Sequence, residues 1–186
     1  MNIFMTDQDP AVAAQSLPDS HVSKMSVETV QMLVSALNRY EIEHNVITQS
    51  GTVHRGGYKN HPCTRWAGDT RTNALWLLNH GLALCDEFEH RYEHEHACKA
   101  QLLQVQKVID QIPDGPFTTP HLAMPDEWKV GDDWIESYRN CIYQKVLDRP
   151  RYFRWVKDPS RMPGWLYDRM GADRLNHLLK ANLATA

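Results

Sequence analysis

A long helix with a single polar strip is the feature that most constrains the fold of this 186-residue chain. Residues 19–38 read DSHVSKMSVETVQMLVSALN, and valine, methionine, leucine and alanine fill most of the helix surface. A set of polar residues at alternating spacings of three and four falls within an arc of roughly 80° on a helix. These residues are His21, Lys24, Glu28, Gln31 and Ser35. Such a helix is expected to be buried on most sides, with its strip facing either bulk water or the floor of a pocket.

The remaining sequence predicts a mainly α, single compact helical domain of about five helices, two of them long, spanning residues 1–186. Further helices are expected at residues 10–16, from 61 to 91–95, at 97–111, 132–147 and 172–180. Asp19 is expected to cap the polar-strip helix. Residues 40–60 and 112–131 are rich in glycine or proline and predict long loops, with an extended stretch near 46–48.

Length and composition fit a soluble protein with a substantial core, since 42% of the residues are hydrophobic and 23% are charged. No run of 18 apolar residues occurs, and the N-terminus lacks a basic flank before an apolar block. We therefore expect no membrane span or signal peptide, and a location in the cytoplasm. The four cysteines form no CxxC pair, which predicts reduced, buried thiols.

The charge is unevenly spread, although the net value is only −3. Residues 145–174 hold eight Lys or Arg against four Asp, and residues 55–71 hold four basic residues against one acid. Residues 86–95 instead carry five acids against one arginine. A polyanion such as DNA could therefore dock on one side of the molecule, although chance unevenness on a solvated surface gives the same pattern.

The strip places an acid (Glu28), a potential amine nucleophile (Lys24) and a potential proton carrier (His21) within two helical turns. A Lys–Glu pair at this spacing is also common on solvated helices. Near residue 61, His61 precedes a proline at a helix start, whose free N–H groups could hold a phosphate or carboxylate. Arg65 and Arg71 would reinforce that site; alternatively, His61 only caps the helix.

Two further groups of residues could bind DNA or a metal. Arginines alternate with aromatic residues at 149–155, an arrangement in which arginines contact phosphates and aromatic rings stack on bases, unless the rings only pack against helices. His90, His94, His96 and Cys98 lie close together, but a zinc site generally needs four well-placed ligands and no second cluster matches. We expect no metal and no cofactor, and we find no nucleophile elbow or glycine-rich phosphate loop.

The segments DSHVSKMSVETVQML, NHPCTRWA and NALWLLNHGLALCDEFEHRY resemble a set of phage-type proteins and, more distantly, the pyrimidine-dimer DNA glycosylase/AP lyase family of phage endonuclease V. The resemblance implies a small α-helical domain whose N-terminal amine attacks the sugar C1′. It also implies a Glu seven residues after the His of an Asp-Gln-His motif, a spacing reproduced by Asp19-Ser20-His21 and Glu28. The family's aromatic and basic tail after an Arg-Pro is similar to residues 149–155.

Three positions depart from that pattern. Val27 and Gln31 stand where the family has arginines, and Asn2 disfavours removal of Met1. The attacking amine would then belong to Met1 or to Lys24, in its unprotonated form.

These observations predict a DNA-acting enzyme of the pyrimidine glycosylase/AP-lyase type, acting on a damaged or modified pyrimidine in phage DNA. The expected catalytic residues are Glu28, Lys24, His21 and Met1. The expected substrate-binding residues are Asp19, Gln31, His61, Thr64, Arg65, Trp66 and Arg71, and the expected DNA contacts are Arg149, Arg151, Tyr152, Arg154 and Trp155. A base-modifying transferase on the same scaffold and a non-catalytic DNA- or protein-binding module are the alternatives.

Overall fold

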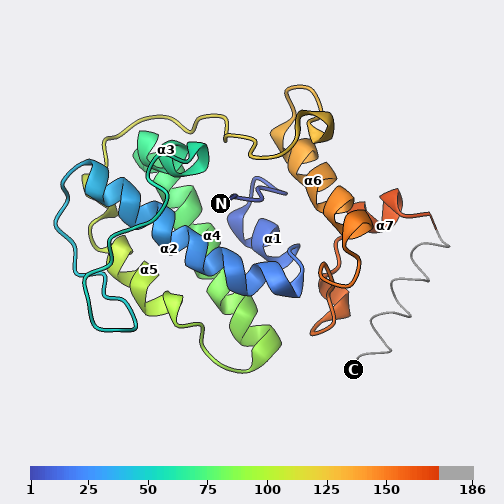
Figure 1. The fold of residues 1–186 in the computed structure, drawn as a ribbon, viewed down its shortest axis with the longest axis horizontal. Helices are drawn as coiled ribbons and strands as arrows, with labels where there is room; N and C mark the ends of the chain where they lie inside the picture. Colours follow the sequence, from blue (N-terminus) through green and yellow to red (C-terminus); the bar gives the residue numbers. More distant parts are fainter. Residues whose placement is uncertain (172–186) are drawn as a thin grey trace.

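The structure is a computed structural model that describes residues 1–171, and within this range it is mainly α-helical, as expected (Figure 1). The α-helices are α1 (Pro10–Gln15), α2 (Asp19–Arg39), α3 (Pro62–Asp69), α4 (Arg71–Tyr92), α5 (Cys98–Gln106), α6 (Trp134–Asp148) and α7 (Gly164–Arg169). Three single-turn 3-10 helices, η1 (Ile109–Gln111), η2 (Asp126–Trp128) and η3 (Pro159–Arg161), complete the described elements. Near the expected extended stretch, Ile47 and Val53 form one isolated antiparallel bridge. The helix expected at 172–180 lies outside the described residues.

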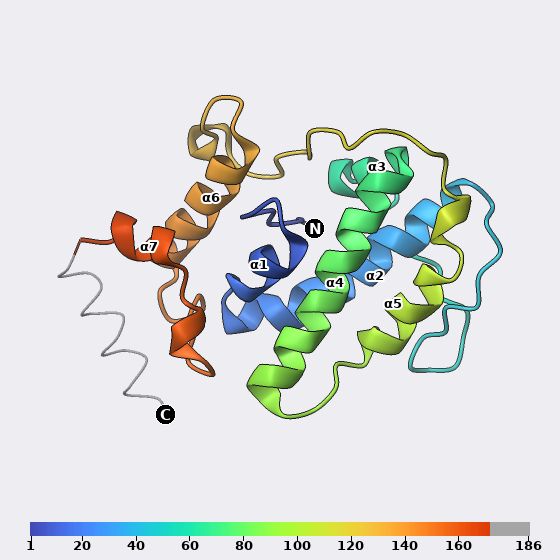
Figure 2. The same ribbon diagram turned by 180° about the vertical axis from the view of Figure 1, so that it is seen from behind.

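Helices α2 and α4 pack against each other at the centre, and α1, α3 and α5 surround them (Figures 1 and 2). Gly81 of α4 permits this approach, because a Cβ at that position would lie 2.6 Å from the Thr29 Cγ2 atom on α2. Most of α2 is buried, as predicted, including Leu33 and Leu37. Full burial of each such leucine contributes about 1.5–3 kcal/mol, so the α2–α4 contact is a major source of stability.

The single helix expected from residue 61 to 91–95 is two helices, so that prediction was wrong at one point. Thr70 has an extended backbone (φ −144°, ψ 153°), and its side chain accepts a hydrogen bond from the Asn73 N–H, which caps α4. The buried Asn73 amide also bonds the Trp66 carbonyl and the Thr118 backbone N–H and hydroxyl. The corner between α3 and α4 therefore holds the long 112–131 segment against the bundle.

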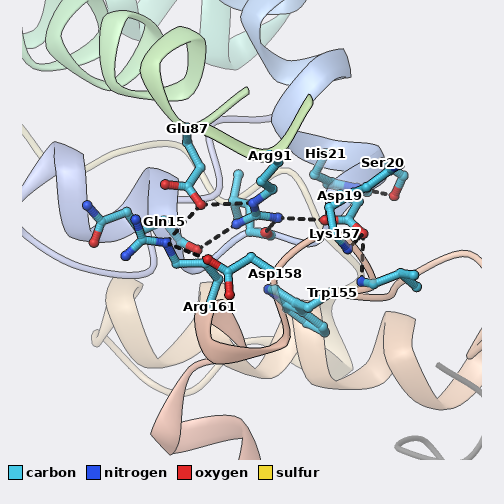
Figure 3. Close-up of polar contacts among 12 residues, drawn as sticks. Gln15, Asp19, Ser20, His21, Glu87, Arg91, Trp155, Lys157, Asp158 and Arg161 are labelled. Carbon is cyan, nitrogen blue, oxygen red and sulfur yellow. Dashed lines mark hydrogen bonds and ion pairs between the residues drawn. The ribbon is translucent and has the colours of Figure 1, made fainter. Parts of the chain in front are cut away.

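Asp19 does not cap α2, contrary to expectation: Pro18 occupies the N-cap position without a side-chain bond, and Asp19 is the first helical residue. The Asp19 carboxylate instead pairs with the Arg91 guanidinium at 3.0 Å and accepts hydrogen bonds from the backbone N–H groups of Val156 and Lys157 (Figure 3). This contact fastens the segment after α6 to the start of α2.

The chain's first residues lie in the middle of the molecule, between the α1–α5 bundle and α6 (Figures 1 and 2). Ile3, Phe4 and Met5 are buried, and Phe4 adopts a positive φ of 50° that turns the backbone. A positive φ is uncommon for a bulky residue and is held only where surrounding contacts fix it. The buried segment therefore fixes Met1 beside α2.

Candidate active site

Three nitrogen atoms converge on the Glu28 carboxylate. The Met1 amine lies 3.9 Å from Glu28 Oε2, and the Asn2 backbone N–H donates to the same oxygen at 3.1 Å. The Lys24 ammonium lies 3.4 Å from Glu28 Oε1. The Glu28 side chain is 13% exposed, whereas that of Lys24 is 59% exposed. The polar strip of α2 thus brings a largely enclosed carboxylate next to an α-amine and a lysine.

These groups open onto a cavity of about 410 Å³. Its walls combine α2, the N-terminal segment, η2 and the end of α6 with the residues that follow it. The Asn2 side-chain amide donates to the Ala123 carbonyl at 3.0 Å, which ties the N-terminal segment to the 112–131 segment at the cavity wall. A cavity of this size with a few convergent polar groups has the character of a small-molecule or nucleotide site.

His21 lies in this cavity wall among aromatic rings. Its ring centre is 4.9 Å from that of Phe4 and 4.7 Å from that of Phe153, and its Nδ1 lies 3.3 Å from the Ser20 hydroxyl. Burial, together with the positive charges of Lys145 and Lys24, lowers the pKa of His21 to about 3. His21 is therefore neutral near pH 7, which suits a wall residue better than a proton carrier.

Lys145 is a cavity residue that the sequence analysis missed. Its ammonium lies over the rings of Phe4, Trp128 and Phe153, at 5.6–6.0 Å from their centres. Cations at this distance are attracted by the faces of aromatic rings. The sequence does contain a signal for this residue, because Lys145 follows Tyr138, Cys141 and Ile142 on the same apolar face of α6. A lysine on an apolar helix face points to a cation held at a defined place.

His61 and Thr64, at the start of α3, lie near Met1. Thr64 is buried, and its hydroxyl contacts the Met1 sulfur at 3.4 Å. His61 caps α3 by accepting the Cys63 N–H at its Nδ1, and burial, together with the positive N-terminus, lowers its pKa. Burial also raises the pKa of the Cys63 thiol to about 12, so this cysteine is not a thiolate nucleophile.

Other residues expected to bind substrate lie elsewhere. Gln31 packs on Gly57 in the loop between α2 and α3, and Arg71 donates to the Ile112 carbonyl. Trp66 is buried and donates its indole N–H to the Thr118 carbonyl at 3.0 Å. Arg65 is exposed between two surface hollows. The structure therefore places His61 and Thr64 near Met1 but outside the cavity lining, while these four residues and Asp19 lie elsewhere.

Of the residues after α6 that were expected to contact DNA, some line the cavity and others do not. Arg149 and Tyr152 line the cavity, and the Tyr152 side chain is exposed to 52%. Trp155 is fully buried and donates to the Ser16 carbonyl, so its ring has no free face. The Arg154 carbonyl accepts the Asp19 N–H, and Arg151 is exposed outside the cavity lining.

Within residues 1–171, no group of three or more His, Cys, Asp or Glu side chains is arranged to hold a metal ion. His90 instead pairs with Asp158 at 2.8 Å, and His94 and His96 bond backbone groups. No helix of the described part is long and apolar enough to cross a membrane.

A carboxylate beside an α-amine, in a cavity walled by aromatic rings and a lysine, brings together the kinds of group that covalent amine chemistry with a general acid/base uses. The family model of the pyrimidine dimer DNA glycosylases matches residues 1–100, more than half of the chain. The protein therefore belongs to this family, and its function at family level is that of a pyrimidine dimer DNA glycosylase. Neither the curated proteins nor the solved structures compared with the chain gave a match. The matched residues include Met1, Lys24, Glu28 and His61 but not Lys145.

Proposed function

We propose that this protein excises a damaged or modified pyrimidine from DNA and then cleaves the strand at the abasic site, with phage DNA as its substrate. The observation that carries the proposal is the convergence of the Met1 amine and the Asn2 N–H on Glu28 at a cavity large enough for a nucleotide. Family membership supports DNA as the partner.

In the proposed reaction, the unprotonated Met1 amine attacks the sugar C1′, and the bond from C1′ to the base breaks with its electron pair leaving on the base. Glu28 accepts the proton that the attacking nitrogen loses. It then returns this proton to O4′ as the sugar ring opens and an iminium forms between the nitrogen and C1′. For strand cleavage, Glu28 removes a proton from C2′ and the 3′-phosphate leaves by β-elimination.

Met1 is the preferred nucleophile over Lys24 because its position is fixed. Ile3 and Met5 are almost fully buried, and the Asn2 side chain is bonded to Ala123, so little freedom remains to be lost when the amine attacks. The Lys24 side chain is more than half exposed and long, and holding it in one geometry costs more entropy. Lys24 is assigned to hold the Glu28 carboxylate in place.

The cavity walls supply the binding surface for the extruded nucleotide. Tyr152 is half exposed, and Trp128 and Phe153 flank Lys145. Stacking on aromatic rings compensates for the stacking that a base loses when it leaves the duplex. Arg149 lies at the same wall and is assigned to a phosphate.

Borohydride trapping on DNA with an abasic site tests the amine chemistry, because reduction converts the iminium into a stable covalent adduct. We expect an adduct whose mass maps to the N-terminal peptide. Glu28→Gln should reduce adduct formation while DNA affinity is kept, and Glu43→Gln, a change of an acid on the loop after α2, should have no effect. No adduct at any pH from about 6 to 9 would refute the lyase reaction, and an adduct on Lys24 would refute the choice of nucleophile.

A further inference from the structure

A basic groove lies next to the candidate active site. It has a volume of about 520 Å³ and is lined by Arg39, Arg55, Lys59 and Arg65, together with polar and small residues of α2, of α3 and of the loop before α3. None of the described residues that line it is acidic. Arg39 pairs with Asp69 at 2.8 Å, whereas no ion pair involves the other three cations within residues 1–171. Like charges gathered without counter-charges repel one another and attract an anionic partner.

The loop that carries Arg55 and Lys59 is fixed against α2. The Gly57 N–H donates to the Ser35 hydroxyl at 2.8 Å and to the Gln31 carbonyl at 3.2 Å, and the Asn38 amide donates to the Arg55 carbonyl. Gly56 has a φ of +73°, and a Cβ there would lie 2.8 Å from the Ser35 backbone nitrogen. The loop is therefore packed backbone to backbone, and the two cations project from a defined support.

Thr64 connects the groove to the catalytic cluster. It lines the groove, and its hydroxyl contacts the sulfur of Met1, whose amine faces Glu28 in the cavity. The groove and the cavity therefore adjoin through the contact between Thr64 and Met1.

We propose that this groove binds the phosphate backbone of the DNA strand next to the excised nucleotide, through Arg55, Lys59 and Arg65. This proposal rests on the proposed function and adds the place where the flanking strand is held. Arginine matches two phosphate oxygens at once, and lysine supplies a point charge, so the groove suits phosphates in succession. Because a phosphate backbone carries no sequence information, the groove contributes affinity rather than base selection.

The salt dependence of DNA binding tests the groove directly. The probe is a fluorescein-labelled duplex with one tetrahydrofuran abasic-site analogue, which lacks the aldehyde and forms no adduct. Dissociation constants are measured by anisotropy over a range of salt concentrations for Arg55→Gln and Lys59→Gln. Each variant should lower the slope of log K against log salt by about 0.9, the value for one lost phosphate contact on B-DNA.

Lys107→Gln is the matched control, because Lys107 is also exposed, lies at the end of α5 and, within residues 1–171, forms no ion pair and donates to the neutral Gln104 side chain. It should leave the slope unchanged. The proposed role of the groove is refuted if Arg55→Gln and Lys59→Gln give the same slope as Lys107→Gln while their melting temperatures are unchanged. Failure of borohydride trapping with an unchanged effect on the slope would instead remove the proposed chemistry and leave the groove standing.

Discussion

Replacing Arg91 should destabilise the protein strongly, because its guanidinium is a buried junction between three parts of the fold. The side chain is 0% exposed and pairs with Glu87 at 2.8 Å and with Asp19 at 3.0 Å (Figure 3). It also donates to the carbonyls of Gln15 and Leu17. Arg91→Met keeps much of the side-chain volume and removes every one of these bonds.

The size of the destabilisation depends on how many partners of Arg91 are left without a hydrogen bond. Removing one partner of a buried ion pair costs about 3–5 kcal/mol. Glu87 keeps Arg161 at 3.0 Å, and Asp19 keeps the backbone N–H groups of Val156 and Lys157, so neither acid is fully stranded. The Leu17 carbonyl loses its side-chain donor at a buried position, and the Gln15 carbonyl loses its own at a part-buried one. We expect a loss of about 3–4 kcal/mol, or about 6–16 °C in Tm for a chain of this size.

Urea unfolding at pH 7, followed by far-ultraviolet circular dichroism, measures this difference. Arg39→Met is the control, because the Arg39–Asp69 pair is 43% and 47% exposed and should cost at most about 1 kcal/mol. The double variant Glu87→Gln/Arg91→Met should lose less than the two single losses added together, since the stranded acid is then neutral. The reasoning is wrong if Arg91→Met unfolds within about 1 kcal/mol of Arg39→Met.

Three further outcomes are expected. Burial lowers the pKa of His80 from 6.5 to about 3. The free energy of unfolding should therefore fall as the pH drops from 6.5 toward 3, by up to about 1.4 kcal/mol per pH unit. A His80→Phe variant that loses stability as steeply as wild type between about pH 6 and 4 in urea titrations would contradict this. Gly56→Ala should lower the free energy of unfolding by about 1–3 kcal/mol, because its Cβ meets the Ser35 backbone at a positive φ; equal urea midpoints would count against the packed loop. Lys145→Met should raise the dissociation constant for abasic-analogue DNA about tenfold or more, measured by anisotropy, whereas unchanged affinity would exclude a charged contact from this residue.

The sequence predicted the helical architecture because its signals are local. The spacing of apolar residues identified α2 and most of α4, and proline and glycine marked the long loops. The break at Thr70 was missed because the apolar pattern runs through it, and only the backbone conformation of that residue and its cap reveal the corner. The capping role expected of Asp19 was likewise wrong, since Arg91, a residue 72 positions away, takes its carboxylate.

Only the part of the site that lies on a single helix could be predicted from the sequence. Lys24 and Glu28 share a face of α2, so their pairing follows from helical spacing. The approach of Met1 depends on a buried segment with an unusual turn at Phe4, which no periodic pattern encodes. Lys145 comes from a helix more than a hundred residues away, and a lone lysine in an amphipathic pattern reads first as a solvated side chain.

The cavity residues proposed to react and the cavity residues proposed to hold the base come from different parts of the chain. The reacting groups, Met1 and Glu28, lie within the residues matched by the family model, whereas Lys145 and Tyr152 lie beyond them. An abasic site has no base to stack, so forming the iminium requires only the first set. Excision additionally requires that a base be held against the walls formed by the second set. Substrate preference among pyrimidines is therefore expected to follow the segment after α6, and the lyase reaction to follow α2 and the N-terminal segment.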